Sequence, residues 1–228
     1  TVVNNRTVLV GDISSTANEI KLSYGELNDV DHTISATNGS ASGTGFVLVL
    51  DENFSIERSL RFNSTSSSGQ SKVLHVSNSS GKISIAGEYS GASVMINNHA
   101  TDSWEGTGCS YLFVAKLNLT LDTQYLTNVR TCRGGTTAYA LESDHSGNEY
   151  LLTANTNPSG NPGLVFNNNG VYSSSSRILR QTMNGEHCGG SGANLAIGKI
   201  NSGSWQWAKQ IGGQSKSYGL DGGLGFTG

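Results

Sequence analysis

The chain lacks the charge and the long apolar runs that several functional classes require. Charged residues make up only 14% of its 228 residues, and 14 Lys and Arg against 17 Asp and Glu give a net charge of −3. No block of basic residues occurs, although binding to nucleic acid needs clustered Lys and Arg to neutralise phosphates. No apolar run approaches the ~18 residues of a membrane-spanning helix. We therefore expect neither a nucleic-acid partner nor a membrane span.

Signals for helix are also scarce. Few Leu, Ala, Glu and Lys residues recur at helical spacing. Small polar residues dominate instead, and the chain also contains 30 Gly. Hydrophobic residues are 35% of the chain, which is low, but short stretches alternate apolar and polar residues as half-buried strands do. This periodicity argues against disorder and predicts an all-β protein, whose length allows one domain with a sizeable core.

The clearest element is a hairpin at Ala193–Gly213. Residues Leu195–Ile200 alternate as a strand, Asn201–Ser204 form a turn cluster, and Trp205–Lys209 form a second strand. Gly203 supplies a residue that takes positive φ easily. Two further segments have the same form, Phe46–Leu60 and Phe113–Cys132. We expect three antiparallel hairpins, each the outer half of a four-stranded sheet.

The three hairpins align at two positions. The turn entries are Asp51, Asn118 and Asn201. One strand later the equivalent residues are Glu57, Gln124 and Gln206, provided that the third turn is one residue shorter. A shared register of this kind indicates a repeated unit.

A second unit precedes each hairpin: a short strand, a polar turn and another strand. It begins at Val8, Val73 and Ala138 and, in compressed form, at Tyr218, with spacings of about 65, 65 and 80 residues. We place the repeats at residues 7–71, 72–136, 137–215 and, in part, 216–228 of a single domain 1–228. A lone four-stranded sheet leaves both faces wet, and stacking such sheets around an axis buries them. The sequence therefore predicts a β-propeller-like array of four-stranded antiparallel blades, about three and a half repeats long, with long loop insertions.

Three segments carry a resemblance to a known repeat: Ser79–Gly91, Asp144–Ala154 and Ser204–Gly213. They resemble the SBBP-type, β-propeller-like repeat of extracellular bacterial and viral surface proteins, and the resemblance covers most of the chain. It implies a propeller-like fold and says little about function. The chain departs from the repeat in the insertions Gly91–Thr107 and Asn155–Gly190 and in the missing WAK-type ending of its first two copies. Both insertions fall between the second and third strand of a repeat, so we expect them to gather on one rim as a contact surface.

Two of the three cysteines flank the second hairpin. If Asn118 pairs with Thr123 at the turn, Cys109 faces Cys132, and opposed residues have Cβ atoms ~4.5–5.5 Å apart, near disulfide reach. Coincidence with two buried thiols is the alternative. We predict a Cys109–Cys132 disulfide, no bond from Cys188 to either, and an oxidising, extracellular setting.

Metal and catalytic motifs are weak. Asp144, Ser146 and Asn148 place oxygen ligands at alternate positions, as a calcium loop does, but the Gly is misplaced and no acidic residue closes the loop. His145, His187 and Cys188 lack the paired spacing of a zinc site. No Gly-x-Ser-x-Gly motif stands between a strand and a helix, and no carboxylate pair suggests a glycosidase. We expect no cofactor and no enzymatic activity, with calcium at the Asp144 loop as an open alternative.

Aromatic residues leave carbohydrate binding open. Trp205 and Trp207 lie two apart on a strand, so we expect them to share one face and to pack between blades. Trp104 and Tyr172 lie on the insertions and are better candidates for contact with a sugar or a partner. Asn-x-Ser/Thr sequons are as frequent as chance allows in this composition, and they stand at Asn5, Asn38, Asn53, Asn63, Asn78 and Asn118.

We interpret the chain as a structural or adhesive component of an extracellular appendage, fibre or virion, such as a phage tail or capsid surface. Its partners would be protein subunits of a larger assembly and, as an alternative, surface glycans. A carbohydrate-binding propeller module is the second hypothesis, and a propeller enzyme with its site in the central channel is the third. The chain begins without Met and ends within a repeat, which suggests a processed product or a piece of a longer chain. Leu224 and Phe226 would then form an open edge that another strand covers.

Overall fold

The computed structural model describes residues 1–13, 19–22, 32–35, 43–64, 69–90, 93–97, 99–101, 109–132, 136–155, 164–167, 177–178 and 194–211. These residues form β-strands and the turns between them, and the described part of the chain contains no helix. The expectation of an all-β protein is therefore confirmed. Every described strand pair is antiparallel.

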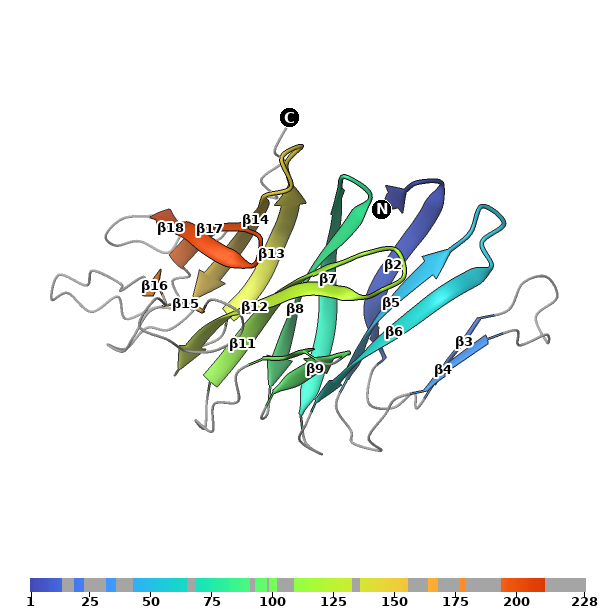
Figure 1. The fold of residues 1–228 in the computed structure, drawn as a ribbon. Coiled ribbons are helices and arrows are strands. Elements are labelled where there is room, and N and C mark those ends of the chain that lie inside the picture. Colours follow the sequence, from blue (N-terminus) through green and yellow to red (C-terminus); the bar gives the residue numbers. More distant parts are fainter. Residues whose placement is uncertain are drawn as a thin grey trace, which may run out of the picture.

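The strands form three large sheets and one isolated hairpin (Figure 1). The first sheet has the order β1 (Val2–Val3), β2 (Arg6–Ile13), β5 (Thr44–Leu50), β6 (Ile56–Ser64), β9 (Val94–Ile96), β10 (His99–Ala100). The second has the order β7 (Gln70–Ser79), β8 (Lys82–Ser90), β11 (Cys109–Leu117), β12 (Thr123–Cys132), β15 (Val165–Asn167), β16 (Arg177–Ile178). The third has the order β13 (Thr136–Ser143), β14 (Glu149–Asn155), β17 (Asn194–Asn201), β18 (Ser204–Ile211). The hairpin is β3 (Glu19–Leu22) with β4 (His32–Ser35).

The three expected hairpins are present as β5–β6, β11–β12 and β17–β18. Their shared register is also confirmed, because each has a β-bulge at the equivalent place: Glu57, Gln124 and Gln206 are the residues that the register skips. A bulge inserts one extra residue and bends the strand. Among the described strands only the third sheet stops at four, so the expected four-stranded blade is wrong for the first two sheets, which have six.

The start of the first repeat differs from the prediction. Val8–Val10 lie in β2, which pairs directly with β5, as β8 pairs with β11 and β14 with β17. They therefore belong to the second strand of the repeat, and the first strand is the short β1. The cause is local: Asn4 and Asn5 both take positive φ and make a two-residue turn, as Ser80 and Gly81 do between β7 and β8.

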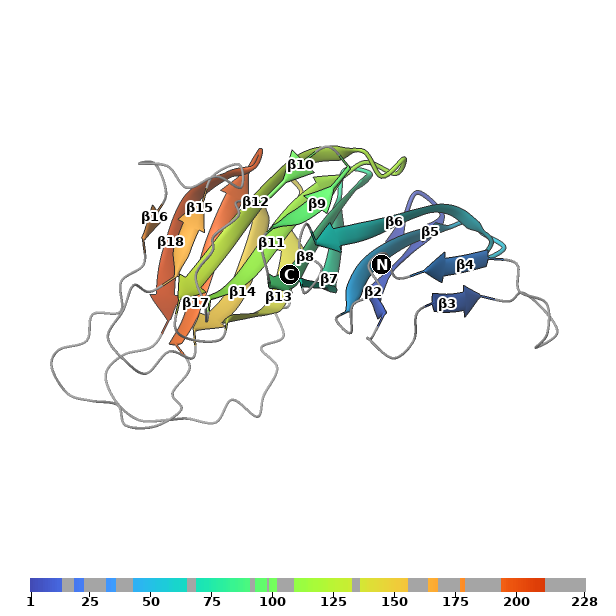
Figure 2. The same ribbon diagram turned by 90° about the horizontal axis from the view of Figure 1, so that it is seen from below.

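The segment after β2 also differs. In sequence, the alternation of Ile20 and Leu22 predicts the second strand of the first repeat, and the polar residues around His32 predict a loop. Instead β3 pairs with β4, and this hairpin stands apart beyond β5 and β6 (Figures 1 and 2).

The described parts of the two long insertions extend existing sheets. The first contributes β9, which pairs with β6 of the preceding sheet, and the second contributes β15, which pairs with β12 of its preceding sheet. Each insertion thus extends the sheet of the repeat before it. The edge strands β6 and β12 have backbone N–H and C=O groups that need partners. An unpaired edge of this kind can pair with any strand within reach, which explains why β9 and β15 add to these sheets.

The three sheets are stacked in a row, and each packs one face against the next sheet (Figures 1 and 2). The core between the first and second sheets includes Val47 and Val49 of β5 against Ile83 and Ile85 of β8. The core between the second and third includes Val114 of β11 and Ile200 of β17. The described strands form this open row and no closed ring.

Candidate functional site: a buried carboxylate between two sheets

The loop proposed for calcium belongs to a turn that occurs three times. Five residues, beginning at Asp51, Asn118 and Asp144, connect paired strands, and the fourth residue of each has positive φ: Phe54, Leu121 and Gly147. In all three the first residue's side-chain oxygen accepts the backbone N–H of the fifth residue. The first residue therefore shapes the turn, as Asp and Asn commonly do.

The Asp144 carboxylate uses its acceptors within this turn. Its Oδ1 accepts the backbone N–H groups of Ser146 and Asn148, and its Oδ2 accepts the Asn148 side-chain amide at 2.7 Å and the Tyr150 hydroxyl at 3.1 Å. These bonds, the Asn148 amide first, lower the pKa of Asp144 to about 2. The side-chain oxygens of Asp144 and Asn148, which the sequence offers as calcium ligands, thus accept hydrogen bonds from donors of the protein itself.

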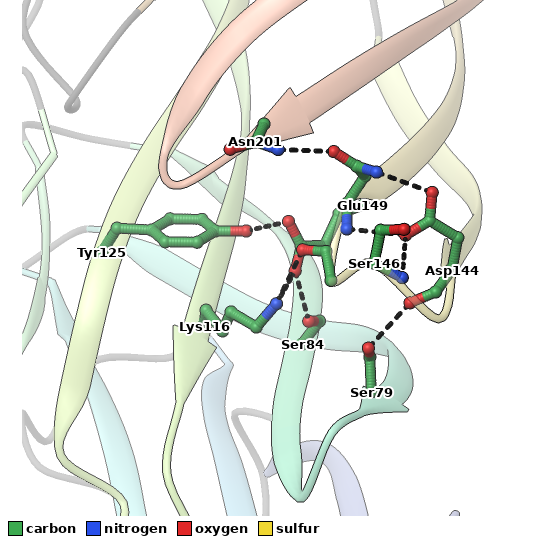
Figure 3. A network of polar contacts seen from close by, with 10 residues as sticks. Ser79, Ser84, Lys116, Tyr125, Asp144, Ser146, Glu149 and Asn201 are labelled. Carbon is green, nitrogen blue, oxygen red and sulfur yellow. Dashed lines mark hydrogen bonds and ion pairs between the residues drawn. The ribbon is translucent and has the colours of Figure 1, made fainter.

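Directly after this turn, Glu149 opens β14 and carries a fully buried carboxylate (Figure 3). Lys116 Nζ and Ser84 Oγ donate to its Oε1, the latter at 3.1 Å, and the Tyr125 hydroxyl donates to its Oε2. The side chain of Lys116 is only 9% exposed. A buried charge is costly unless it is paired and hydrogen-bonded, and here both conditions are met.

Three strands of the second sheet supply the three donors. Ser84, Lys116 and Tyr125 are direct neighbours across β8, β11 and β12 in the strand register. We call them the donor row. Burial and the Glu149 carboxylate raise the pKa of Tyr125, so its hydroxyl stays protonated and donates. The register thus places three donors in one line opposite the Glu149 carboxylate of the third sheet.

A second layer of contacts ties the turn and the hairpin around this pair (Figure 3). Lys116 Nζ also donates to the Gly147 carbonyl at 2.9 Å, and Asn201 donates from its side chain to the Asn148 side chain at 2.6 Å. Ser79 Oγ, at the β7–β8 turn, donates to the Asp144 carbonyl at 2.7 Å. The arrangement couples the second sheet to the third through directional bonds.

The sequence did not single out Glu149 or its donors. Glu149 reads as the end of a polar turn, and Lys116 follows the apolar run Tyr111–Ala115. A lysine inside an otherwise apolar strand was the available signal, because a buried lysine requires an anionic partner. The partner lies 33 positions away, and nothing local identifies it.

The expectation that Trp205 and Trp207 share a face is wrong. Trp205 pairs with Ile200 and is buried against Phe166, with ring centroids 4.7 Å apart, whereas Trp207 pairs with Lys199. The bulge at Gln206 breaks the two-residue alternation between them. Trp207 is half-buried on the opposite, outer face of the third sheet.

On that outer face a second row stands at the register positions of the donor row. Tyr150, Lys199 and Trp207 are neighbours across β14, β17 and β18, as Ser84, Lys116 and Tyr125 are across the second sheet. The Lys199 ammonium lies 5.6 Å from the centre of the Tyr150 ring, a cation–π contact, and all three side chains are half-buried. We call them the outer row.

The other predicted site residues are placed as follows. Cys109 and Cys132 face each other in the β11–β12 register, as expected, while their side chains lie outside the described part. Trp104, Tyr172, Cys188, Leu224 and Phe226 lie outside the described residues. In the described ranges no three His, Cys, Asp or Glu side chains are grouped so that they could hold a metal ion.

No protein-family model matches the chain, and a search of curated proteins finds no similar sequence. The part of the chain that the structure describes has no helix with the length and apolar character needed to cross a membrane.

Proposed function

We propose that the protein is a non-enzymatic structural or adhesive component of an extracellular appendage, fibre or virion surface, such as a phage tail or capsid, built from SBBP-type, propeller-like repeats. The observation that carries the proposal is the double coupling between successive repeats. The sheets of the second and third repeats each pack on the sheet before them, and each of these repeats also adds a pair of short strands to that preceding sheet. A chain joined in this way resists separation of its units, which suits a load-bearing or surface role.

The buried carboxylate supports a structural role over catalysis. Glu149 is fully buried, and both of its carboxylate oxygens accept hydrogen bonds from Ser84, Lys116 and Tyr125. A catalytic acid or base must come within hydrogen-bond reach of its substrate. Here the ion pair joins sheets, and we infer that this is its task.

Immunogold electron microscopy on intact cells or particles of the source tests the proposal. Antibodies against the chain are expected to label an extracellular filament, appendage or virion surface, and the same serum adsorbed with the purified chain serves as control. Label confined to the cell interior would contradict the proposed role.

Carbohydrate binding is a second candidate, favoured by one observation. Tyr150 and Trp207 present tilted rings, with centroids 6.2 Å apart, on the half-exposed outer face of the third sheet. Such aromatic faces stack on sugars. A glycan array tests this idea: binding that Trp207→Ala removes would support it, and no binding to any glycan would reject it.

A further inference from the structure

Two of the three large sheets are completed by strands of the following repeat. We call each such pair of short strands a latch hairpin. The latch β9–β10 comes from the segment between β8 and β11 and pairs with β6, and the latch β15–β16 comes from the segment between β14 and β17 and pairs with β12. In both, the first strand of the latch makes the pairing and the second strand lies outside it.

The third sheet has no such completion among the described strands. It ends at β18, and no described strand pairs with the outer edge of β18. In the hairpin register β18 corresponds to β6 and β12, the two strands that accept a latch. Gln210 and Ile211 of β18 stand where Asn128 and Val129 stand on β12, and these two residues pair with β15.

The hairpin β3–β4 is a latch without an acceptor. It comes from the segment between β2 and β5, which correspond to β8 and β11, so it occupies the place of the other two latches in its repeat. Residues 14–18 lead into it, as residues 91–93 lead into β9. Yet within the described part of the chain β3 and β4 pair only with each other and join none of the large sheets (Figures 1 and 2). An isolated two-stranded hairpin is marginally stable in water.

We propose that β3–β4 of one molecule docks on β18 of a second copy of this chain, with β3 antiparallel to β18 and β4 outside it. The third sheet then gains two strands and matches the six-stranded first and second sheets. In sequence β3 carries Ile20 and Leu22 at alternate positions, as β9 carries Val94 and Ile96, which are fully buried beneath the first sheet's outer edge. This inference rests on the proposed function and names its subunit contact.

In this arrangement the outer face of the first sheet would pack against a sheet of the other molecule. The corresponding faces of the second and third sheets are already buried within the chain. Leu9 of β2 corresponds to Ile85 and Leu151, both at 0% exposure, but is itself 44% exposed, and Val2 beside it is 65% exposed. Leu48, which pairs directly with Leu9 across β2 and β5, and Leu50 lie on the same face and are already buried within the chain. Stacking on the outer row of the preceding molecule would cover Leu9 and Val2. Exposed apolar residues at positions that are core elsewhere in the same chain favour a partner of the same construction.

Such a contact is head-to-tail, because the two surfaces differ. A heterologous contact of this kind repeats from molecule to molecule and yields rings or filaments. Every copy of the chain carries both the β3–β4 hairpin and the β18 edge. The partner that we propose is therefore a second copy of the same chain.

Sedimentation velocity of the purified 228-residue chain over a range of concentrations tests the proposal. We expect a concentration-dependent series of multimers. Two variants remove the donor: replacement of residues 15–41 by a short Gly-Ser linker, and Ile20→Asp within the intact hairpin. The linker is compatible with the fold because Ile13 and Thr44 pair directly. Each variant should weaken self-association at least tenfold, whereas Lys21→Asp, the matched control, should not.

A peptide of residues 17–37 provides the converse test. It should bind the linker variant one to one, slow amide exchange in β18, and inhibit assembly of the unaltered chain, while a scrambled peptide should do none of these. An unaltered chain that stays monomeric at every concentration, or a linker variant that associates as tightly as the parent, overturns the proposal. Surface labelling by immunogold is independent of these outcomes, so failure of the docking and failure of the proposed function can be told apart.

Discussion

Removing the charge of Glu149 should destabilise the contact between the second and third sheets strongly. In Glu149→Gln the Tyr125 hydroxyl keeps an acceptor, but Lys116, whose side chain is 9% exposed, loses the anion that compensates its charge. Breaking a buried ion pair by removing one partner costs about 3–5 kcal/mol. We expect a loss of this size in the free energy of unfolding, measured by urea titration with circular dichroism. Fluorescence of Trp205, which is 2% exposed and lies in the core between these sheets, should change in the same transition.

A double-mutant cycle separates the pair from its surroundings. Lys116→Met should cost a similar amount, and Lys116→Met with Glu149→Gln should cost less than the two losses together, because neither charge is then left buried alone. The matched control is Glu57→Gln at the half-exposed Arg6–Glu57 pair, where water screens the charges and the loss should be small. A Glu149→Gln loss below about 1 kcal/mol, or strict additivity in the cycle, would refute the reasoning.

Three further outcomes follow from the same structure. Gly198→Ala should lower stability by about 1–3 kcal/mol in thermal unfolding, because an added Cβ would lie 2.5 Å from the Trp205 ring; an unchanged melting temperature would contradict the packing. Asp144 has a lowered pKa of about 2, so its contribution to stability is complete above its ordinary pKa and is lost as the pH falls toward 2; acid melts of Asp144→Asn should lose less stability than the parent over that range, and parallel curves would be evidence against it. Oxidised protein should lose two hydrogens in mass through a Cys109–Cys132 bond, and Cys109→Ser should cost about 3 kcal/mol; full alkylation of both thiols without reductant would exclude the bond.

Much of the architecture follows from local patterns in the sequence. Alternation of apolar and polar residues marked the hairpin at Leu195–Ile211, and short apolar runs beside polar turns marked the other two. Asp51, Asn118 and Asn201 marked the turns, because turn geometry depends on near neighbours. Cys109 and Cys132 also face each other as expected, although the turn pairs Leu117 and not Asn118 with Thr123. The bulge at Gln124 shifts the register by one residue and brings the two cysteines opposite each other.

Other features depended on a bulge or a turn that periodicity does not reveal. Trp205 and Trp207 lie on opposite faces because Gln206 is the extra residue of a bulge. The first repeat begins at β1 because Asn4 and Asn5 adopt positive φ. Asn tolerates this conformation, but an Asn in the sequence does not by itself predict it. At Gln206 one residue shifts the register, and a shift of one residue exchanges the two faces of a strand.

Contacts between repeats were decided by the tertiary structure alone. The latches β9–β10 and β15–β16 pair with strands of the preceding repeat, and Glu149 meets Lys116 across two sheets. The sequence of one partner does not identify the other. A backbone edge pairs with any strand that reaches it, and a carboxylate accepts hydrogen bonds from any donors that the packing brings near. The sequence by itself thus determined the strands and turns, while the choice of partners depended on which edges and faces the folded chain placed together.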